Sequence, residues 1–242
     1  MTRKPDLKNI EKVAAVVPAA GAGLRMGGES AKQFLDLNGT PLLAITLRPF
    51  ETCQAIQAVI LVVPPDAIEY CRNEIVKKFK LKKIKDVLPG GKRRQDSVRL
   101  GLEAVEEEYN LVLIHDGARP LIDETLINRI IQTAKENRAV ITGMPAKETV
   151  KEVNHLTEVT KTYRREKIWL IQTPQVFRRS DIIEGHRRAY EENWEEVTDD
   201  SLLLERLGIP VKVIQGSEKN IKVTTPYDFK LAQILLGRGF AF

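Results

Sequence analysis

Short apolar runs alternate with amphipathic stretches along most of the chain. The apolar runs are strand-sized and continuously hydrophobic, which is typical of strands buried on both faces. They occupy residues 13–17, 57–63, 84–88, 111–114, 139–144, 169–177 and 210–214. The stretches between them predict helices over 40–53, 66–79, 92–108, 121–137, 181–192, 198–208 and from 225 onward. This alternation predicts an α/β fold with a doubly wound, mostly parallel Rossmann-like sheet.

Two shorter patterns add detail to this fold. Further short strands are expected at 33–37 and 220–224. The helix over 40–53 is expected to use the Thr40 hydroxyl as its cap, with Pro41 at its first helical position.

The segment 146–167 departs from the α/β pattern. Its apolar residues alternate with charged ones around Asn154-His155, which predicts a solvent-facing β-hairpin. Such a hairpin buries little surface by itself, so it either lies over the sheet or extends toward another chain. We expect an extended β-arm within one domain that spans residues 1–242.

The first apolar run leads into a glycine-rich loop. Pro18 ends the run, and Gly21 and Gly23 allow the backbone to turn and to approach a ligand closely. Arg25 and Lys32 add positive charges that a packed turn does not need. This order of features indicates a phosphate site.

Three other interpretations of the loop compete with a phosphate site. A tight turn between a strand and a helix explains the glycines alone. A dinucleotide fingerprint is broken because Met26 replaces its third glycine, and a Walker loop is broken because Gln33 follows Lys32. The segment does resemble the loop of nucleotidyltransferases that activate sugars and polyols.

Two more loops follow predicted strands, at 90–97 and 115–119. The carboxyl ends of parallel strands meet at one edge of a sheet, so we expect both loops to gather beside the glycine-rich loop. Asp116 is a candidate metal or substrate ligand there, although a helix cap or a partner for Arg119 is an equally good interpretation. His115 follows four apolar residues and is expected to be a hydrogen-bonded core residue.

Composition narrows the class of protein. The 242 residues carry a net charge of +5, which suits a polyphosphate ligand as well as a nucleic acid, but aromatic residues for base stacking are scarce. The longest apolar runs are too short to span a membrane, and the first twelve residues are polar and unlike a secretory signal, so a cytoplasmic protein with no membrane partner is expected. Cys53 and Cys71 lack metal spacing and are expected to be buried thiols.

Seven strings together resemble those of 2-C-methyl-D-erythritol 4-phosphate cytidylyltransferases. They are PAAGAGLRM, Lys32-Gln33, GGKRRQDSV, HDGARP, Arg165 with the following TPQ, TDD, and NIKVTTPYD, in that order. The resemblance implies one nucleotidyltransferase domain that joins CTP to methylerythritol phosphate, releases pyrophosphate and uses Mg²⁺. Ribitol-5-phosphate cytidylyltransferases share the loop and TPQ and remain an alternative acceptor class. Lys92 is a departure, since many members carry an acid there, so it is given no role.

The implied reaction is an attack by a phosphate oxygen of the acceptor on the α-phosphorus of CTP. A phosphate monoester is already an adequate nucleophile, so no general base is required, and the barrier comes from charge crowding and alignment. Two alternatives from other classes are a non-catalytic nucleotide-binding module and an RNA-binding protein. The first should have lost the cations of the reaction, and the second should lack acids at the strand ends.

The resemblance also implies roles for single residues. Arg25 and Lys32 would contact the α-phosphate and the leaving group, and Arg165 and Lys222 would hold the acceptor phosphate. The nucleotide is expected to contact Pro18, Ala19, Ala20, Gly21, Gly23, Gly91, Arg94, Ser97 and Gly117. The acceptor is expected to contact Asp116, Arg119, Thr149, Arg165, Thr173, Thr198 and Lys222, with Asp116 also as the metal ligand. The resemblance further suggests that the 146–167 arm crosses a two-fold axis in a homodimer.

Overall fold

A central sheet of seven strands organises the computed structural model, which describes residues 11–21, 34–194 and 197–237. In spatial order the strands are β11 (Val211–Gln215), β7 (Ala139–Pro145), β10 (Trp169–Arg178), β6 (Leu111–Ile114), β1 (Val13–Pro18), β4 (Ala58–Val63) and β5 (Ile84–Pro89). Four of the pairings are parallel, and β10 alone runs antiparallel to its neighbours β6 and β7. The predicted α/β fold with a mostly parallel sheet is confirmed.

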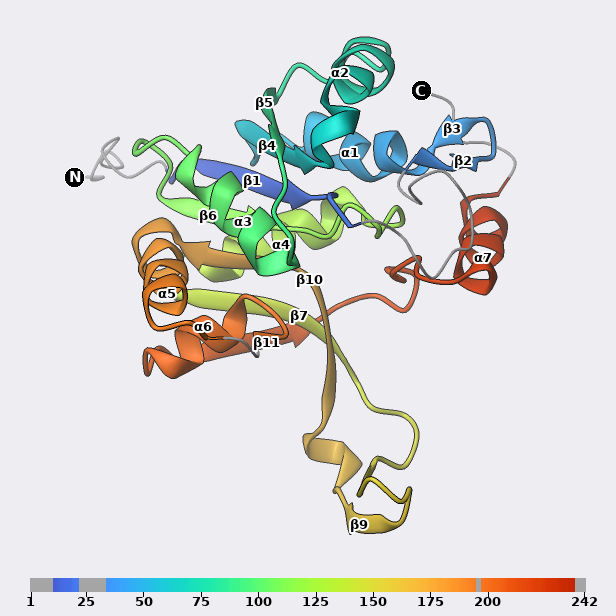
Figure 1. Cartoon of the computed structure of the whole chain (residues 1–242), viewed down its shortest axis with the longest axis vertical. Coiled ribbons are helices and arrows are strands. Elements are labelled where there is room, and N and C mark those ends of the chain that lie inside the picture. Colours follow the sequence, from blue (N-terminus) through green and yellow to red (C-terminus); the bar gives the residue numbers. More distant parts are fainter. Residues whose placement is uncertain (1–10, 22–33, 195–196, 238–242) are drawn as a thin grey trace, which may run out of the picture.

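Helices cover both faces of this sheet (Figure 1). They are α1 (Leu42–Thr52), α2 (Ile68–Tyr70), α3 (Arg94–Glu103), α4 (Glu124–Ala134), α5 (Arg179–Glu191), α6 (Ser201–Arg206) and α7 (Pro226–Leu236). Alternate residues of β1 face opposite cores, because side chains alternate along a strand. Val13, Ala15 and Val17 pack with α1 and α4, whereas Ala14 and Val16 pack with α3, α5 and α6. This two-sided burial explains why the central strands are continuously apolar.

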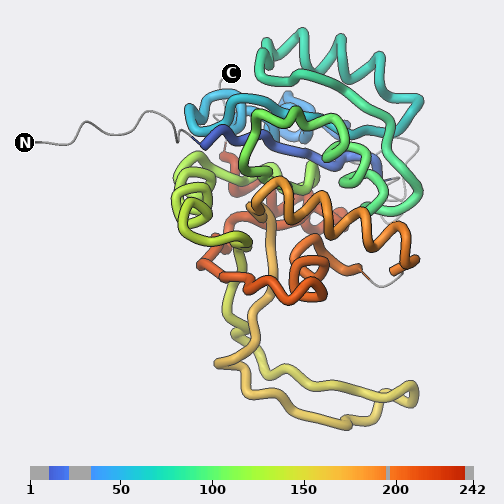
Figure 2. The backbone as a smooth tube through the Cα atoms, turned by 90° about the vertical axis from the view of Figure 1, so that its left-hand side faces the viewer, coloured from blue at the N-terminus to red at the C-terminus, as the bar shows by residue number. Residues whose placement is uncertain are grey.

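The chain leaves the sheet after β7 and returns through β10, which accounts for the antiparallel direction of β10. Between them lie β8 (Lys151–Val153), β9 (Val159–Thr162) and the short helix η5 (Arg165–Lys167). Every residue of β8 and β9 is exposed. Figures 1 and 2 show this hairpin extending away from the body, as expected for an arm that does not fold over the sheet. Its assignment to one domain with the rest of the chain stays a prediction.

Three details differ from the expected elements. Residues 220–224 form no strand. Among the described residues, a single main-chain hydrogen bond, from the Val223 N–H to the Ala118 carbonyl at 2.8 Å, ties this segment to the loop after β6, so no ladder forms. Thr40 belongs to β3 (Thr40–Pro41), which pairs with β2 (Asp36–Leu37), so α1 begins at Leu42 without a side-chain cap.

The third difference concerns the helix expected over 66–79. It consists of a 3-10 turn, η3 (Pro65–Ala67), then α2, then the π-helical segment η4 (Cys71–Lys77). Cys53 and Cys71 are free and buried, as predicted. No helix in the part of the chain described here is long and apolar enough to cross a membrane.

Candidate active site

Main-chain hydrogen bonds to the ends of β1 and β4 hold three loops at the carboxyl edge of the sheet. The Ala19 N–H donates to the Val62 carbonyl at 2.7 Å, and the Gly117 N–H donates to the Pro18 carbonyl at 3.0 Å. The Gly90 N–H donates to the Val63 carbonyl at 2.8 Å. The loops that follow β1, β5 and β6 therefore meet where the parallel topology predicts.

Two glycines make this close approach possible. A Cβ atom on Gly90 would lie 2.1 Å from the Cβ of Ala20, and one on Gly117 would lie 2.7 Å from the Cβ of Ala19. Both distances are shorter than two non-bonded carbon atoms tolerate, so a side chain at either position would force the loops apart.

A cavity of about 470 Å³, the smaller cavity, lies between these loops. Every predicted nucleotide contact that the structure describes lines it, namely Pro18, Ala19, Ala20, Gly21, Gly91, Arg94, Ser97 and Gly117. Gly23, Arg25 and Lys32 lie outside the described residues. Much of the lining is small residues, so main-chain groups are accessible to a flat, polar ligand.

Ser97 holds one of these loops in place. Its hydroxyl accepts from the Gly91 N–H at 3.1 Å and donates to the Arg93 carbonyl at 3.2 Å. Ser97 is 3% exposed. Its role in this structure is to shape the wall of the smaller cavity.

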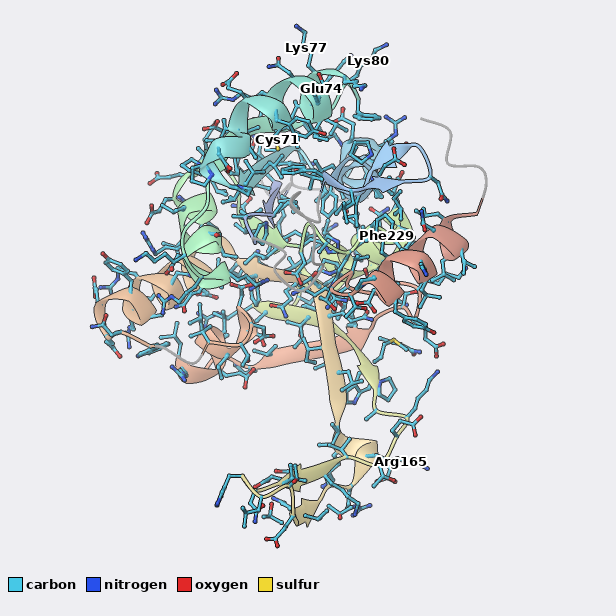
Figure 3. All side chains as sticks on the ribbon, turned by 45° about the vertical axis from the view of Figure 1, so that its right-hand side comes forward. Cys71, Glu74, Lys77, Lys80, Arg165 and Phe229 are labelled. Atoms are coloured by element: carbon cyan, nitrogen blue, oxygen red, sulfur yellow. The ribbon has the colours of Figure 1, made fainter. Side chains whose placement is uncertain are left out.

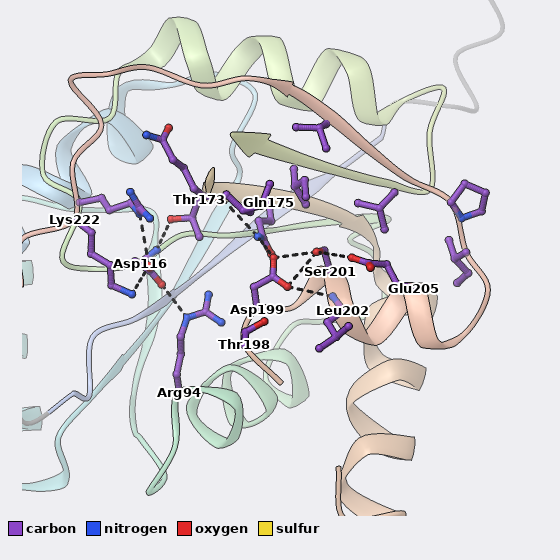
Figure 4. A pocket seen from close by; sticks show the side chains of 18 of the residues that line it. Arg94, Asp116, Thr173, Gln175, Thr198, Asp199, Ser201, Leu202, Glu205 and Lys222 are labelled. Carbon is purple, nitrogen blue, oxygen red and sulfur yellow. Dashed lines mark hydrogen bonds and ion pairs between the residues drawn. The ribbon is translucent and has the colours of Figure 1, made fainter. Parts of the chain in front are cut away.

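A second cavity of about 890 Å³, the larger cavity, adjoins the first (Figure 4). Among its lining residues are five of the predicted acceptor contacts, Asp116, Arg119, Thr173, Thr198 and Lys222. Arg94, Asp116 and Lys222 line both cavities. These three charged side chains therefore mark the boundary where two ligands would meet.

Asp116 lies at the centre of this boundary. Its Oδ1 atom is 2.9 Å from Arg94 Nε, and its Oδ2 atom is 2.9 Å from Lys222 Nζ and 3.6 Å from Arg119 Nε. Burial acts to raise the pKa of this carboxyl, but the three cations outweigh it and hold the pKa well below its ordinary value. Asp116 is therefore ionised, and the surplus of positive charge suits an anionic ligand.

A chain of hydrogen bonds behind Asp116 fixes its main chain. The Asp116 N–H donates to Thr173 Oγ1 at 3.0 Å, and Thr173 Oγ1 lies 3.1 Å from His115 Nδ1. His115 Nε2 lies 3.2 Å from the Arg119 carbonyl. Complete burial lowers the pKa of His115 to about 4, so the ring is neutral at pH 7, accepts from Thr173 and donates to Arg119.

These bonds bear on the expected roles of His115 and Thr173. His115 is a hydrogen-bonded core residue, as predicted. The hydroxyl of Thr173 donates its single proton to His115 Nδ1. Thr173 can therefore only accept a hydrogen bond from a ligand.

Arg165 and Thr149 are not brought to this site within one chain. Both are exposed on the arm, and Arg165 Nη1 donates to the Lys147 carbonyl at 3.0 Å. Figure 3 shows Arg165 on the arm, away from the body. A role for either residue in the reaction therefore requires the arm of another copy or a different arm position.

Sequence reasoning missed several polar residues of the larger cavity. Asp199 accepts from Gln175 Nε2 at 2.8 Å and from the Ser201 hydroxyl at 2.9 Å (Figure 4). Asp200 lies behind Arg94, with its Oδ2 atom 2.8 Å from Arg94 Nη1. The TDD string named this region, but no local pattern distinguished the roles of its two acids.

The described residues offer no ready-made metal site. Within 11–21, 34–194 and 197–237, no three His, Cys, Asp or Glu side chains are grouped so that they could hold a metal ion. Both oxygens of Asp116 are engaged by cationic side chains. The described residues alone therefore do not form a Mg²⁺ centre.

An open α/β sheet with a glycine-walled cavity at its carboxyl edge, adjoining a second cavity lined by cations and carboxylates, is typical of nucleotide-binding α/β enzymes. The model of one family, 2-C-methyl-D-erythritol 4-phosphate cytidylyltransferase, matches residues 13–238. This chain belongs to that family, whose members are nucleotidyltransferases.

Individual relatives agree with the family. The chain is 44% identical over 225 residues to a 2-C-methyl-D-erythritol 4-phosphate cytidylyltransferase of Syntrophus aciditrophicus, covering 93% of this chain and 96% of the relative. It is 45% identical to one of Alkaliphilus metalliredigens, covering 94% of each. The solved 4-diphosphocytidyl-2C-methyl-D-erythritol synthase of Anaerococcus prevotii superposes with a TM-score of 0.82 at 33% identity, over 94% of this chain and 99% of that one. The comparisons give no support to the ribitol phosphate, non-catalytic or RNA-binding alternatives.

Proposed function

We propose that this enzyme couples CTP to 2-C-methyl-D-erythritol 4-phosphate and yields 4-diphosphocytidyl-2-C-methyl-D-erythritol and pyrophosphate. One observation carries the proposal at the level of the site. Two cavities of about 470 and 890 Å³ meet at Arg94, Asp116 and Lys222, so a nucleotide in one and a phosphorylated polyol in the other would bring their phosphates together.

In this arrangement the smaller cavity takes the cytidine and the larger cavity takes the polyol. The small residues of the smaller cavity leave main-chain groups available to the edge of a base. The larger cavity offers carboxylate, hydroxyl and amide groups, which suit the hydroxyls of a polyol.

The chemistry is one in-line displacement at phosphorus. A phosphate oxygen of the acceptor forms a bond to the α-phosphorus, the bond from that phosphorus to the oxygen bridging to the β-phosphate breaks, and the electron pair leaves with pyrophosphate. No proton needs to move. The protein's contribution is to hold two anions in line and to balance their charge.

Lys222 is the described residue best placed for this task. Its Nζ atom is 2.9 Å from Asp116 Oδ2, at the boundary of both cavities, and its side chain is 39% exposed. A bound phosphate can replace Asp116 as the ion-pair partner of the Lys222 ammonium group, because Asp116 keeps Arg94 and Arg119 as partners. The proposed contacts of Arg25 and Lys32 with the α-phosphate rest on the sequence alone.

We further propose that Mg²⁺ arrives with the CTP, on its phosphate oxygens, and that the reaction takes place in the cytoplasm. The scarcity of metal ligands among the described residues supports the first point. Direct coordination by Asp116 stays a prediction, since it requires Lys222 or Arg94 to give way. Two free buried thiols are in keeping with a reducing compartment.

A homodimer is also proposed, with Arg165 of each arm serving the partner's larger cavity. Where the arm joins the body, β10 carries exposed apolar side chains, with Leu170 60% exposed and Trp169 37% exposed. A second copy of this chain is the occupant that would also explain the position of Arg165, because a two-fold contact buries the same patch twice.

Pyrophosphate release with each of the four nucleoside triphosphates, against methylerythritol phosphate and ribitol 5-phosphate, tests the proposed function. We expect turnover with CTP and methylerythritol phosphate that exceeds every other combination by at least about tenfold, since a mismatched polar ligand leaves buried groups unpaired. Faster turnover with ribitol 5-phosphate, or no turnover with any pair, would contradict it.

A further inference from the structure

A buried relay of polar side chains reaches Arg94 from behind the two cavities. His186 Nε2, on α5, lies 3.2 Å from Asp200 Oδ1, and Asp200 Oδ2 lies 2.8 Å from Arg94 Nη1. The side chains of His186 and Asp200 are 2% and 1% exposed. We propose that Asp200 and His186 are positioning residues that fix the Arg94 guanidinium at the boundary of the cavities.

Arg94 needs a second anchor because its first one is shared. Asp116 balances Arg94, Lys222 and Arg119 at once, and substrate binding changes that balance. Asp200 pairs with Arg94 on a separate guanidinium nitrogen, so Arg94 stays in place while Asp116 exchanges partners. Without Asp200, the guanidinium would follow Asp116 and rotate toward the incoming phosphates.

Burial makes this pairing strong. Burial lowers the pKa of a guanidinium, but Asp200 and Asp116 outweigh that effect and raise the pKa of Arg94. Removing one partner of such a group leaves the other charge buried and unbalanced. Asp200 therefore cannot be neutralised without disturbing Arg94.

His186 acts one step further back. It donates from Nε2 to one oxygen of Asp200 and so directs the other oxygen to Arg94. His186 Nδ1 has no partner among the described residues, so Asp200 is the contact that its ring serves. A side chain with a donor at the position of Nε2 should keep the relay, whereas an apolar one should break it.

The inference rests on the proposed function for its kinetic test. We expect Asp200→Asn to lower kcat for pyrophosphate release about tenfold to a hundredfold while the KM for CTP changes less than about threefold, because small misplacements of a positioned group cost rate rather than nucleotide affinity. His186→Leu should give a smaller loss of the same kind, and His186→Gln should restore most of it.

The double variant with Arg94→Ala separates positioning from a general structural role. If Asp200 acts through Arg94, then Asp200→Asn lowers kcat no further in the Arg94→Ala background. Losses that multiply would overturn the proposal. Asp181→Asn is the control, since it removes a different Asp–Arg pair, with Arg138 Nη2 at 2.6 Å. Asp181 lies on α5, as His186 does, and it lines neither cavity. We expect its kcat to match the wild type.

A second readout does not depend on turnover. The Nη1–H protons of Arg94, on the nitrogen that donates to Asp200 Oδ2 at 2.8 Å, should give a slowly exchanging NMR signal, assigned by its loss in Arg94→Ala. We expect faster exchange in Asp200→Asn and His186→Leu and protection in His186→Gln. Unchanged exchange in both disruptive variants would overturn the relay, and should Asp200→Asn not fold, the two His186 variants decide alone. An inactive wild type with these exchange differences intact would contradict the proposed function and support the relay.

Discussion

The carboxyl edge of the sheet and the arm differ in how their charged side chains are held. At the edge, Asp116 is buried and shared by three cations, and its main chain is fixed by Thr173 and His115. On the arm, Arg165 is exposed and donates to the nearby Lys147 carbonyl. The body therefore fixes its charged side chains through contacts within its own chain, whereas the arm presents its cation to solvent.

The largest effect is expected from removing a cation of the body. Lys222→Ala should lower kcat/KM for methylerythritol phosphate by about 10² to 10³, the scale for one preorganised charged contact at a reacting phosphate. Pyrophosphate release at varied acceptor concentration measures it. Lys219→Ala, which changes an exposed lysine of the same segment that lines neither cavity, serves as the control.

The same scale of loss is expected for Arg25→Ala and Lys32→Ala, for which the family resemblance implies contacts with the α-phosphate. Near-normal turnover in all three variants, with folding verified by circular dichroism, would contradict the assignment of these cations to the reacting phosphates.

Acid should destabilise the body through its buried His115, whereas the histidine of the arm, His155, is exposed. Burial lowers the pKa of His115 from 6.5 to about 4, so the unfolded chain binds the proton first and stability falls as the pH drops from about 6.5 toward 4. The expected loss from this group is about 3 kcal/mol of unfolding free energy. Urea titrations at pH 7 and pH 4.5 measure most of it.

Two histidine variants localise this acid effect. His115→Gln should reduce the difference between the two pH values, whereas His155→Gln, which changes an exposed residue of the arm, should leave it unchanged. Equal pH dependence in both variants would assign the acid sensitivity to other groups. Asp116 and Asp200, whose pKa values are lowered, lose their contribution only below their ordinary range near 3.8.

A smaller effect is expected from the cation of the arm. Arg165→Ala should raise the KM for methylerythritol phosphate by about tenfold, because one exposed charged contact to a phosphate is lost, and it should change the KM for CTP much less. Lys161→Ala offers an exposed cation of β9 for comparison. A weakened KM for CTP with an unchanged acceptor KM would assign Arg165 to the nucleotide instead.

Mixing two impaired variants gives the most specific result with the smallest signal, with turnover measured at an acceptor concentration well below the KM of the Arg165→Ala variant. If the arm completes the partner's site, Lys222→Ala and Arg165→Ala subunits in one dimer place both defects in one site and leave the other intact. Equal amounts with random exchange should then recover about a quarter of the wild-type turnover. Verified subunit exchange without recovery would return Arg165 to its own chain.

Much of the fold followed from the sequence because its strands are buried on both faces. The runs at 13–17 and 111–114 could be assigned from hydrophobicity alone, and parallel topology then placed three loops at one edge. The prediction of a strand over 220–224 was wrong, because the alternation of Ile221 and Val223 does not show whether another strand lies beside them. Strand pairing is a tertiary property that a local pattern does not contain.

The candidate site was predictable only in part for the same reason. Asp116 could be recognised at a strand end, but its pairing with Lys222 joins residues far apart in the chain, and only the resemblance pointed to Lys222. His186 was passed over although Ile182, His186 and Ala189 are spaced as one helical face. A polar residue on an apolar face was the available signal, and its partner Asp200 needed the structure.

The arm is inserted between two strands that are already neighbours, and this makes it separable. Ala146 N–H donates to the Ile168 carbonyl at 2.9 Å, so the chain is closed into a ladder before the arm begins. Replacing residues 149–165 by a two-residue Asn-Gly turn would convert β7 and β10 into an ordinary hairpin. Such a shortened chain would keep the residues that line both cavities and would serve as a reagent for screening nucleotide-site ligands, with CTP titration calorimetry reporting whether the smaller cavity survives the graft.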